Sequence, residues 1–138
     1  MRRILVTGAN GQLGNAMRLL GATSRNEYRF TDVAELDITD EEAVRRAVCD
    51  GRIDVIMHAA GVISTYDFML AEESEIRRLF DINIMGTSHM LQAGLRHMMP
   101  RRSGNIVTTA SIAGRTNLGM LEHYCVSKAA VISLTQAG

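Results

Sequence analysis

Apolar residues in this chain gather into short runs with little polar alternation inside them. Such runs are typical of parallel strands that are covered on both faces. They predict five strands, over residues 4–7, 28–31, 34–38, 54–58 and 105–110. The first run follows two arginines, but it stops at Gly8 without a cleavage pattern, which favours a strand over a signal peptide.

Apolar residues recur at helical spacing between these runs. Thr39 precedes a cluster of acids and suits the N-cap of a helix. We expect helices over residues 12–20, 39–48 and 124–136, with further helical stretches that end before Pro100. The alternation predicts a Rossmann-like, doubly wound α/β fold in a single domain over residues 1–138, with about five mostly parallel strands and helices on both faces.

Composition narrows the range of partners. Lys plus Arg and Asp plus Glu both number 15, so the formal net charge is zero and no general attraction to nucleic acid or an acidic membrane surface is expected. No apolar run approaches the roughly 20 residues of a membrane span. Cys49 and Cys125 form neither a disulfide framework nor a zinc motif. These features predict a cytoplasmic protein without a metal site.

A glycine-rich segment follows the first strand and leads directly into the first helix. Its residues are Thr7, Gly8, Ala9, Asn10, Gly11, Gln12, Leu13 and Gly14, with a glycine at every third position from Gly8. The glycines would permit a tight turn, let the backbone approach a pyrophosphate and let the helix pack on the strand, while the helix N-terminus offers N–H groups. This context predicts dinucleotide binding; a tight turn without a ligand is the alternative.

Asp32 ends the second strand, near the spacing at which an acid commonly hydrogen-bonds the adenosine ribose. Its carboxylate would repel a 2′-phosphate, and Asn10 adds no positive charge. NAD is therefore expected rather than NADP, although rearrangement of Arg25 or Arg29 would help to hold a phosphate. The alternative is that Asp32 merely starts a turn.

Tyr124 and Lys128 are four positions apart in the last predicted helix, so they share a face. A tyrosine with a pKa of about 10 is a poor acid or base at neutral pH, and a nearby ammonium lowers that pKa. Ser111 follows the last predicted strand, at the edge where open α/β sheets place ligands. This arrangement suits proton transfer to a bound oxygen.

With these motifs the chain resembles the short-chain dehydrogenase/reductase family. The matching segments are TGxxGxxG at 7–14, Ala59-Ala60-Gly61, Asn83-Ile-Met-Gly86, Ser111-Ile-Ala-Gly114 and Tyr124-xxx-Lys128. The resemblance implies hydride transfer between a nicotinamide dinucleotide and an alcohol, carbonyl or sugar substrate. Motifs in family order with compatible spacing make this match specific.

The resemblance also implies individual roles. Tyr124 would protonate the substrate oxygen, Ser111 would orient that oxygen, Lys128 would bind the nicotinamide ribose, and Asn83 would hold a relay water. Asp37, Ile38 and the turn at 59–61 would contact the cofactor. The alternatives are a capping Ser111, a core Tyr124, a solvated Lys128 and an Asn83 that bonds backbone.

Two features depart from the family. Residues 1–40 resemble the extended branch that reduces nucleotide-activated sugars, notably dTDP-4-dehydrorhamnose reductases. Residues from about Gly51 resemble the ordinary branch, notably sorbitol-type dehydrogenases, although His58 stands where that branch favours Asn. The hypothesis is a chimera joined between about Thr39 and Asp54.

The second departure concerns the end of the chain, because family members continue past the position of Gly138 with segments that enclose the substrate. The expectation is a C-terminally truncated protein with an edge strand at 105–110 and self-association through helices near Phe80 and Tyr124. Three functions stay open: an oxidoreductase, a dinucleotide-binding fragment without useful turnover, and a structural or oligomerising module that binds no ligand.

Overall fold

The computed structural model describes all residues from 1 to 138. Its sheet contains four parallel strands, β1 (Arg3–Thr7), β2 (Glu27–Thr31), β3 (Val55–His58) and β4 (Asn105–Thr108), in the order β2-β1-β3-β4. Thr7 lies opposite Thr31 on one side and His58 on the other. The carboxyl ends of these strands therefore meet at one edge of the sheet.

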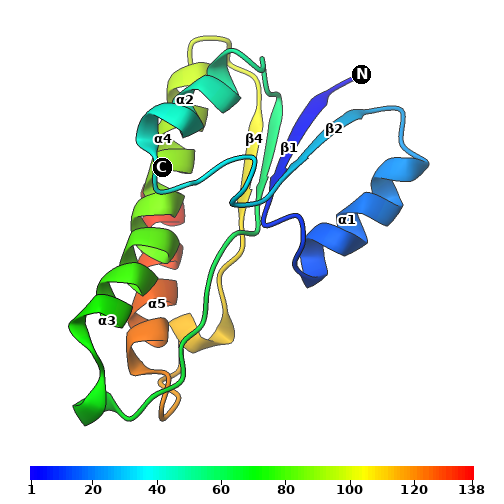
Figure 1. Cartoon of the computed structure of the whole chain (residues 1–138). Helices are drawn as coiled ribbons and strands as arrows, with labels where there is room; N and C mark the ends of the chain where they lie inside the picture. Colours follow the sequence, from blue (N-terminus) through cyan, green and yellow to red (C-terminus); the bar gives the residue numbers. More distant parts are fainter.

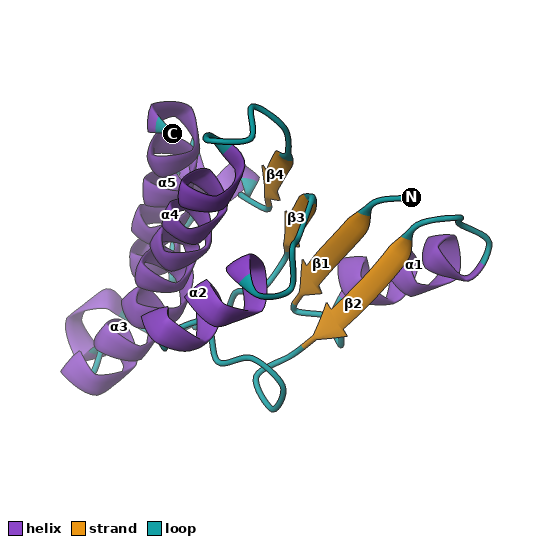
Figure 2. Ribbon diagram, turned by 90° about the horizontal axis from the view of Figure 1, so that it is seen from above, coloured by secondary structure: helices purple, strands orange, loops and turns teal.

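Helices cover both faces of this sheet (Figures 1 and 2). They are α1 (Gln12–Ala22), α2 (Glu41–Cys49), α3 (Glu73–Phe80), α4 (Gly86–Met98) and α5 (Glu122–Ala137), with short turns η1 (Phe68–Leu70), η2 (Asp81–Met85) and η3 (Ile112–Gly114). Helix α1 lies on one face, and α2 and α4 lie on the other, with α5 beside α4. The doubly wound α/β prediction is confirmed. None of the helices has the length and apolar character needed to cross a membrane.

The main core lies between the sheet and the pair α2 and α4. Leu5 and Ile56 from the sheet meet Val44, Val48 and Met90 from the helices, and all five are fully buried. Each such side chain contributes about 1.5–3 kcal/mol of burial free energy. This packing fixes the positions of β1 and β3, whose ends carry the candidate site.

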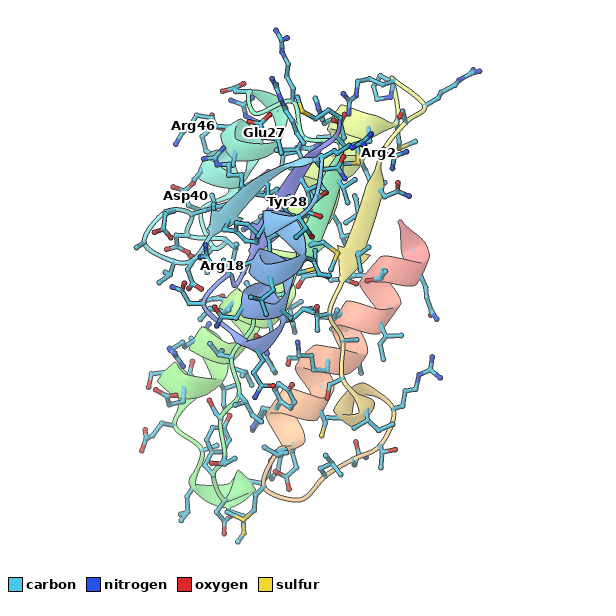
Figure 3. All side chains as sticks on the ribbon, turned by 90° about the vertical axis from the view of Figure 1, so that its right-hand side faces the viewer. Arg2, Arg18, Glu27, Tyr28, Asp40 and Arg46 are labelled. Atoms are coloured by element: carbon cyan, nitrogen blue, oxygen red, sulfur yellow. The ribbon has the colours of Figure 1, made fainter.

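Helix α1 packs against β2 through aromatic side chains. The rings of Tyr28 and Phe30 stack with centroids 5.6 Å apart. The Arg18 guanidinium lies 4.6 Å from the centroid of Phe30, a cation–π contact. Figure 3 labels Arg18 on α1 and Tyr28 on β2. These contacts hold α1 against β2, and the short loop between Thr7 and Gln12 places the N-terminus of α1 beside the end of β1.

The predicted strand at 34–38 is wrong. The amides of Glu35 and Leu36 both donate to the carbonyl of Asp32, at 3.0 and 2.8 Å, so the chain turns directly after β2. Leu36 and Ile38 are nevertheless buried in the main core. Their two-residue spacing reflects a loop that buries apolar side chains, and the sheet has four strands instead of five.

The predicted cap at Thr39 is also wrong by one residue. Asp40 is the N-cap of α2, and its carboxylate accepts a hydrogen bond from the amide of Ala43 at 2.9 Å. The Thr39 hydroxyl instead donates to Asp37 at 2.7 Å. The acids of the first turn, Glu41 and Glu42, lie as expected at the positive end of the helix.

Candidate functional site

A cavity of about 570 Å³ opens at the carboxyl edge of the sheet. Nine of its lining residues were predicted from the sequence: Thr7, Gly8, Gly11, Asp32, Asp37, Ile38, Ala59, Ala60 and Gly61. Seven were not: Val33, Leu36, Thr39, Val62, Arg78, Asp81 and Ile82. The last three come from the segment leading into α4, far from the motifs in sequence, and no periodic or motif signal marks them.

Gly8 and Gly14 of the loop are each required to be glycine for a different steric reason. Gly8 has a φ of +66°, and a Cβ there would lie 2.7 Å from the backbone of Ala59 and Ala60. A Cβ on Gly14 would lie 2.5 Å from the carbonyl oxygen of Gly8. Any larger residue at either position would thus force backbone atoms apart, so the loop closes over β3 only with glycine.

The loop leaves the N-terminus of α1 without a side-chain cap. Gly11 is its N-cap residue, so the amides of the first turn have no side-chain acceptor. Within the loop, Asn10, Gln12 and Leu13 are exposed, whereas Gly14 is buried beneath it. These amides give the cavity a positive end that suits an anionic group.

Asp32 joins the loop to the end of β2. One carboxylate oxygen accepts from the amide of Asn10 and the other from the amide of Val33, both at 2.9 Å. Its backbone carbonyl meanwhile starts the turn after β2. Both interpretations of Asp32 are thus compatible, since it starts a turn and also presents its carboxylate at the cavity.

Asp37 and Ile38 also line the cavity. The Asp37 carboxylate accepts from the amide and hydroxyl of Thr39, and these hydrogen bonds lower the pKa of Asp37 below its usual value. The Ile38 carbonyl is 2.9 Å from the Nδ1 of His89. The Ile38 side chain packs in the main core, so this residue anchors the cavity wall.

Asn83 is buried in η2 and clamps the chain that leaves β3. Its Oδ1 accepts from the amide of Val62, and its Nδ2 donates to the Val62 carbonyl, both at 2.8 Å. Nδ2 also donates to the Ser127 hydroxyl at 3.0 Å. The Asn83 side chain thus bonds backbone, as the alternative interpretation held, and joins it to α5.

Lys128 is not solvated: only 5% of it is exposed. Its Nζ donates to the Thr109 carbonyl at 3.1 Å and lies 5.7 Å from the ring centroid of Tyr124. Burial lowers the pKa of Lys128 from its usual value. A Cβ on Gly61 would lie 3.2 Å from this ammonium, so the glycine in the cavity lining leaves room for it.

Ser111 caps the turn η3, and this turn packs against α5 at Lys128. Its Oγ accepts from the amide of Ala113 at 3.2 Å, which leaves the hydroxyl proton available for another acceptor. The turn η3 that it starts packs on α5, where a Cβ on Gly114 would lie 2.7 Å from the backbone of Lys128. Neither Ser111, Tyr124, Lys128 nor Asn83 lines the main cavity.

A buried network around His58 was missed. Its Nδ1 is 2.8 Å from the Thr7 hydroxyl, and its Nε2 is 3.0 Å from the Thr87 hydroxyl, which donates to the Asn83 carbonyl at 2.7 Å. In the sequence, His58 stood out only as a departure from the Asn that the ordinary branch favours at this position. Its register opposite Thr7 depends on the pairing of β1 with β3, which a single sequence does not display.

Burial holds the pKa of His58 at about 4, below its ordinary value of 6.5, and the positive charge of Lys128 adds to the effect. Because the unfolded chain takes up a proton that native His58 does not, stability should fall as pH drops from 6.5 towards 4. The loss attributable to this group is about 3 kcal/mol at most. Urea unfolding across that window should show a weaker pH dependence for His58→Gln. An equal dependence in both proteins would assign the titration to other groups.

Comparisons with known proteins agree with this geometry. A family model described as short chain dehydrogenase matches residues 2–138. Estradiol 17-beta-dehydrogenase 1 of Rattus norvegicus is 37% identical over 109 residues, which are 77% of this chain and 32% of that protein. Sorbitol dehydrogenase of Cereibacter sphaeroides is 38% identical over 108 residues, which are 74% of this chain and 42% of that protein.

A solved structure extends the likeness to the fold. The crystal structure of NAD⁺-bound xylitol dehydrogenase matches with a TM-score of 0.89 at 30% identity, covering 99% of this chain and 63% of that chain. The chain thus spans less than half of the two curated relatives and about two thirds of the solved one. Since the family model matches almost every residue, the chain belongs to the short-chain dehydrogenase/reductase family.

Proposed function

We propose that this chain carries the cofactor site and proton-transfer residues of an NAD(P)-dependent oxidoreductase acting on an alcohol or carbonyl group. One observation carries the proposal: buried Lys128 lies against Gly61, which lines the same cavity as Gly8 and Gly11 of the glycine loop. The relatives that share the family are named as dehydrogenases of sorbitol, xylitol and estradiol. Their names support a hydroxyl or ketone substrate.

The residues present fit a nicotinamide dinucleotide. The uncapped N-terminus of α1 would hold the pyrophosphate, and Asp32 would accept from the adenosine ribose. The wall formed by Ala59, Ala60 and Gly61 would let the cofactor pass close to backbone. The nicotinamide, when bound, supplies or accepts the hydride.

The protein's own residues would manage the proton. Tyr124 would donate it to the substrate oxygen during reduction, and the free hydroxyl proton of Ser111 would orient that oxygen. Lys128, held by the Thr109 carbonyl, would place its positive charge beside the tyrosine ring. The Asn83 carbonyl accepts from Thr87 and keeps a second lone pair, which is the position we propose for the relay water.

The preferred cofactor would be NAD. Asp32→Asn keeps one oxygen that can accept from the Asn10 amide, gives up the acceptor for the Val33 amide, and removes the negative charge that would face a 2′-phosphate. Isothermal titration should show the NADPH to NADH affinity ratio rising about tenfold, the effect of about 1.4 kcal/mol of Coulomb repulsion between partly exposed charges. Asp50→Asn, with the same net-charge change outside the cavity, should leave the ratio unchanged. An unchanged ratio in Asp32→Asn would place that carboxylate away from the adenosine.

Binding without useful turnover is the second candidate, and one observation favours it. Neither Ser111 nor Tyr124 lines the cavity, and both residues are partly exposed. No cavity of the described residues 1–138 is lined by Ser111 or Tyr124, so these residues form no pocket there that would shield a substrate from water. A protein of this kind would bind the cofactor and transfer hydride only slowly.

Cofactor consumption separates the two candidates. The chain would be incubated with NADH and either a ketose or a steroid ketone, and loss of NADH absorbance would be followed. Carbonyl-dependent loss supports the oxidoreductase. Tight NADH binding with no loss above the background of Tyr124→Phe supports the second candidate.

We also propose self-association, supported by the exposed edge of the sheet. Strand β4 has a partner on one side only, and its Val107 is 45% exposed. A homo-oligomer would cover this surface. Sedimentation equilibrium of the purified chain tests the proposal, because a monomer at high concentration would contradict it.

A mixed origin is a further proposal. The turn at 32–40 leads from β2 straight to α2, and His58 replaces the Asn favoured by the ordinary branch. Both features support a first segment related to the extended branch and a second related to polyol dehydrogenases. Scoring residues 1–40 and 51–138 separately against each branch tests it, since one shared best match would contradict a chimera.

A further inference from the structure

A continuous hydrogen-bonded chain crosses the interior between the glycine loop and α5. It starts at the Thr7 hydroxyl, passes through the ring of His58 to Thr87, and reaches the Asn83 carbonyl. These four residues are all buried, with at most 2% of each exposed. These side chains are thus shielded from bulk water, and each depends on its protein partners for hydrogen bonds.

The partners determine which ring nitrogen of His58 carries the proton. The Thr87 hydroxyl donates its only proton to the Asn83 carbonyl, so it must accept from Nε2 of His58. Nε2 is therefore protonated, and Nδ1 accepts from the hydroxyl of Thr7. Every donor in the chain then has an acceptor, which a ring protonated on Nδ1 would not allow.

Beyond Asn83 the chain continues to the helix of the catalytic tyrosine. The Asn83 side chain bonds Val62 on both backbone groups and donates to Ser127. The Ser127 hydroxyl in turn donates to the carbonyl of Tyr124 at 2.8 Å. A displacement of Asn83 would therefore reach both the cavity wall at Val62 and the first turn of α5.

We propose that His58 is a positioning residue with two ends: Nδ1 fixes Thr7 at the cofactor loop, and Nε2 fixes Thr87 and Asn83 beneath the catalytic helix. The terms cofactor loop and catalytic helix rest on the proposed function, whereas the connection between the two through His58 rests on the hydrogen bonds alone. His58 touches neither cofactor nor substrate in this scheme. It sets the geometry of the residues that do.

Two substitutions remove the contacts of His58 with Thr7 and with Thr87 one at a time. His58→Asn keeps an acceptor at the δ position for Thr7 but is too short to reach Thr87. His58→Gln keeps a donor at the ε position for Thr87 but offers Thr7 no acceptor. The structure therefore predicts opposite local effects from two polar replacements of one side chain.

Nuclear magnetic resonance of the cofactor-free chain measures the hydrogen bonds at both nitrogens of His58. Ring ¹⁵N shifts of His58 should show the Nε2–H tautomer. His58→Asn should speed hydrogen exchange of the Val62 amide about fivefold and shift the Asn83 carboxamide signals, the effect of one lost buried hydrogen bond. His58→Gln should leave Val62 near its original rate and shift the signals of Thr7 and Gly8. His97→Gln, a change in the last turn of α4, should alter neither region.

The proposal fails if the ring is protonated on Nδ1, or if both variants disturb the two regions equally. It also fails if Val62 exchanges at the original rate in His58→Asn. None of these measurements requires turnover. A failure of the proposed function would appear instead as absent NADH binding, so the two proposals can fail separately. Where turnover is measurable, His58→Asn should lower kcat more than His58→Gln, and His58→Gln should raise the NADH dissociation constant more.

Discussion

Replacing Tyr124 by phenylalanine should lower carbonyl reduction by about 100- to 10,000-fold, the usual contribution of a positioned general acid. The ring would keep its place on α5, 5.7 Å from the Lys128 ammonium, while the transferable proton is removed. Cofactor affinity should change little, because the glycine loop and Asp32 lie elsewhere on the sheet edge. Turnover and NADH titration of the same preparation measure both quantities.

Tyr28→Phe is the matched control for this substitution. Tyr28 stacks on Phe30 under α1, so loss of its hydroxyl removes a tyrosine oxygen without touching the proposed site. Turnover of this variant should equal that of the unmodified protein. Full activity in Tyr124→Phe would show that the proton comes from another group.

Replacing Gly14 by valine should lower both stability and cofactor affinity. The new Cβ would meet the Ala9 backbone and lie 2.5 Å from the Gly8 carbonyl oxygen. These are backbone atoms of the loop itself, so the collision is relieved only by moving the loop from β1. A destabilisation of about 3 kcal/mol is expected from such overpacking, which corresponds to a fall in Tm of about 10 °C for a chain of this size.

Gly119→Val controls for the change of residue type. A Cβ at Gly119 has no heavy atom within 4 Å, so that variant should melt close to the original temperature. Thermal unfolding of the two variants and NADH titration below their melting temperatures make the comparison. An equal Tm in Gly14→Val and the parent would mean that the helix does not pack against the loop as described.

Local patterns predicted the parts of the site that lie close together in sequence. In the segment from Gly8 to Gly14, the backbone needs residues without a Cβ, and the N-terminus of α1 has no side-chain cap. The residue types alone indicate both properties. Tyr124 and Lys128 share a helix face because of their four-residue spacing. Both features depend on local geometry alone.

Features that depend on tertiary contact were missed or wrongly assigned. The spacing of Leu36 and Ile38 looks like a strand, yet a turn at Asp32 carries them into the core beneath α2 and α4. In so short a segment, apolar residues two positions apart indicate that their side chains are buried, but they do not distinguish a strand from a loop. His58 shows the same limit, because its partners Thr7 and Thr87 lie on other elements.

Asn83 illustrates the limit of a motif. The resemblance implied a residue that holds a relay water, but it gave no sign of the three hydrogen bonds that its side chain makes to Val62 and Ser127. Those bonds explain why an amide is needed there: it alone offers an acceptor and two donors in one plane. The structural role thus accompanies the proposed catalytic one.

The most direct test of the account is calorimetric titration of the purified chain with NADH and NADPH. We expect saturable binding with one site per chain, tighter for NADH because the proposed place of Asp32 at the adenosine ribose would disfavour a 2′-phosphate. Absence of heat with either cofactor, in a chain whose circular dichroism shows it folded, would contradict the central claim. The glycine loop would then be a tight turn, and Asn83, Ser111, Tyr124 and Lys128 would have no cofactor to act on.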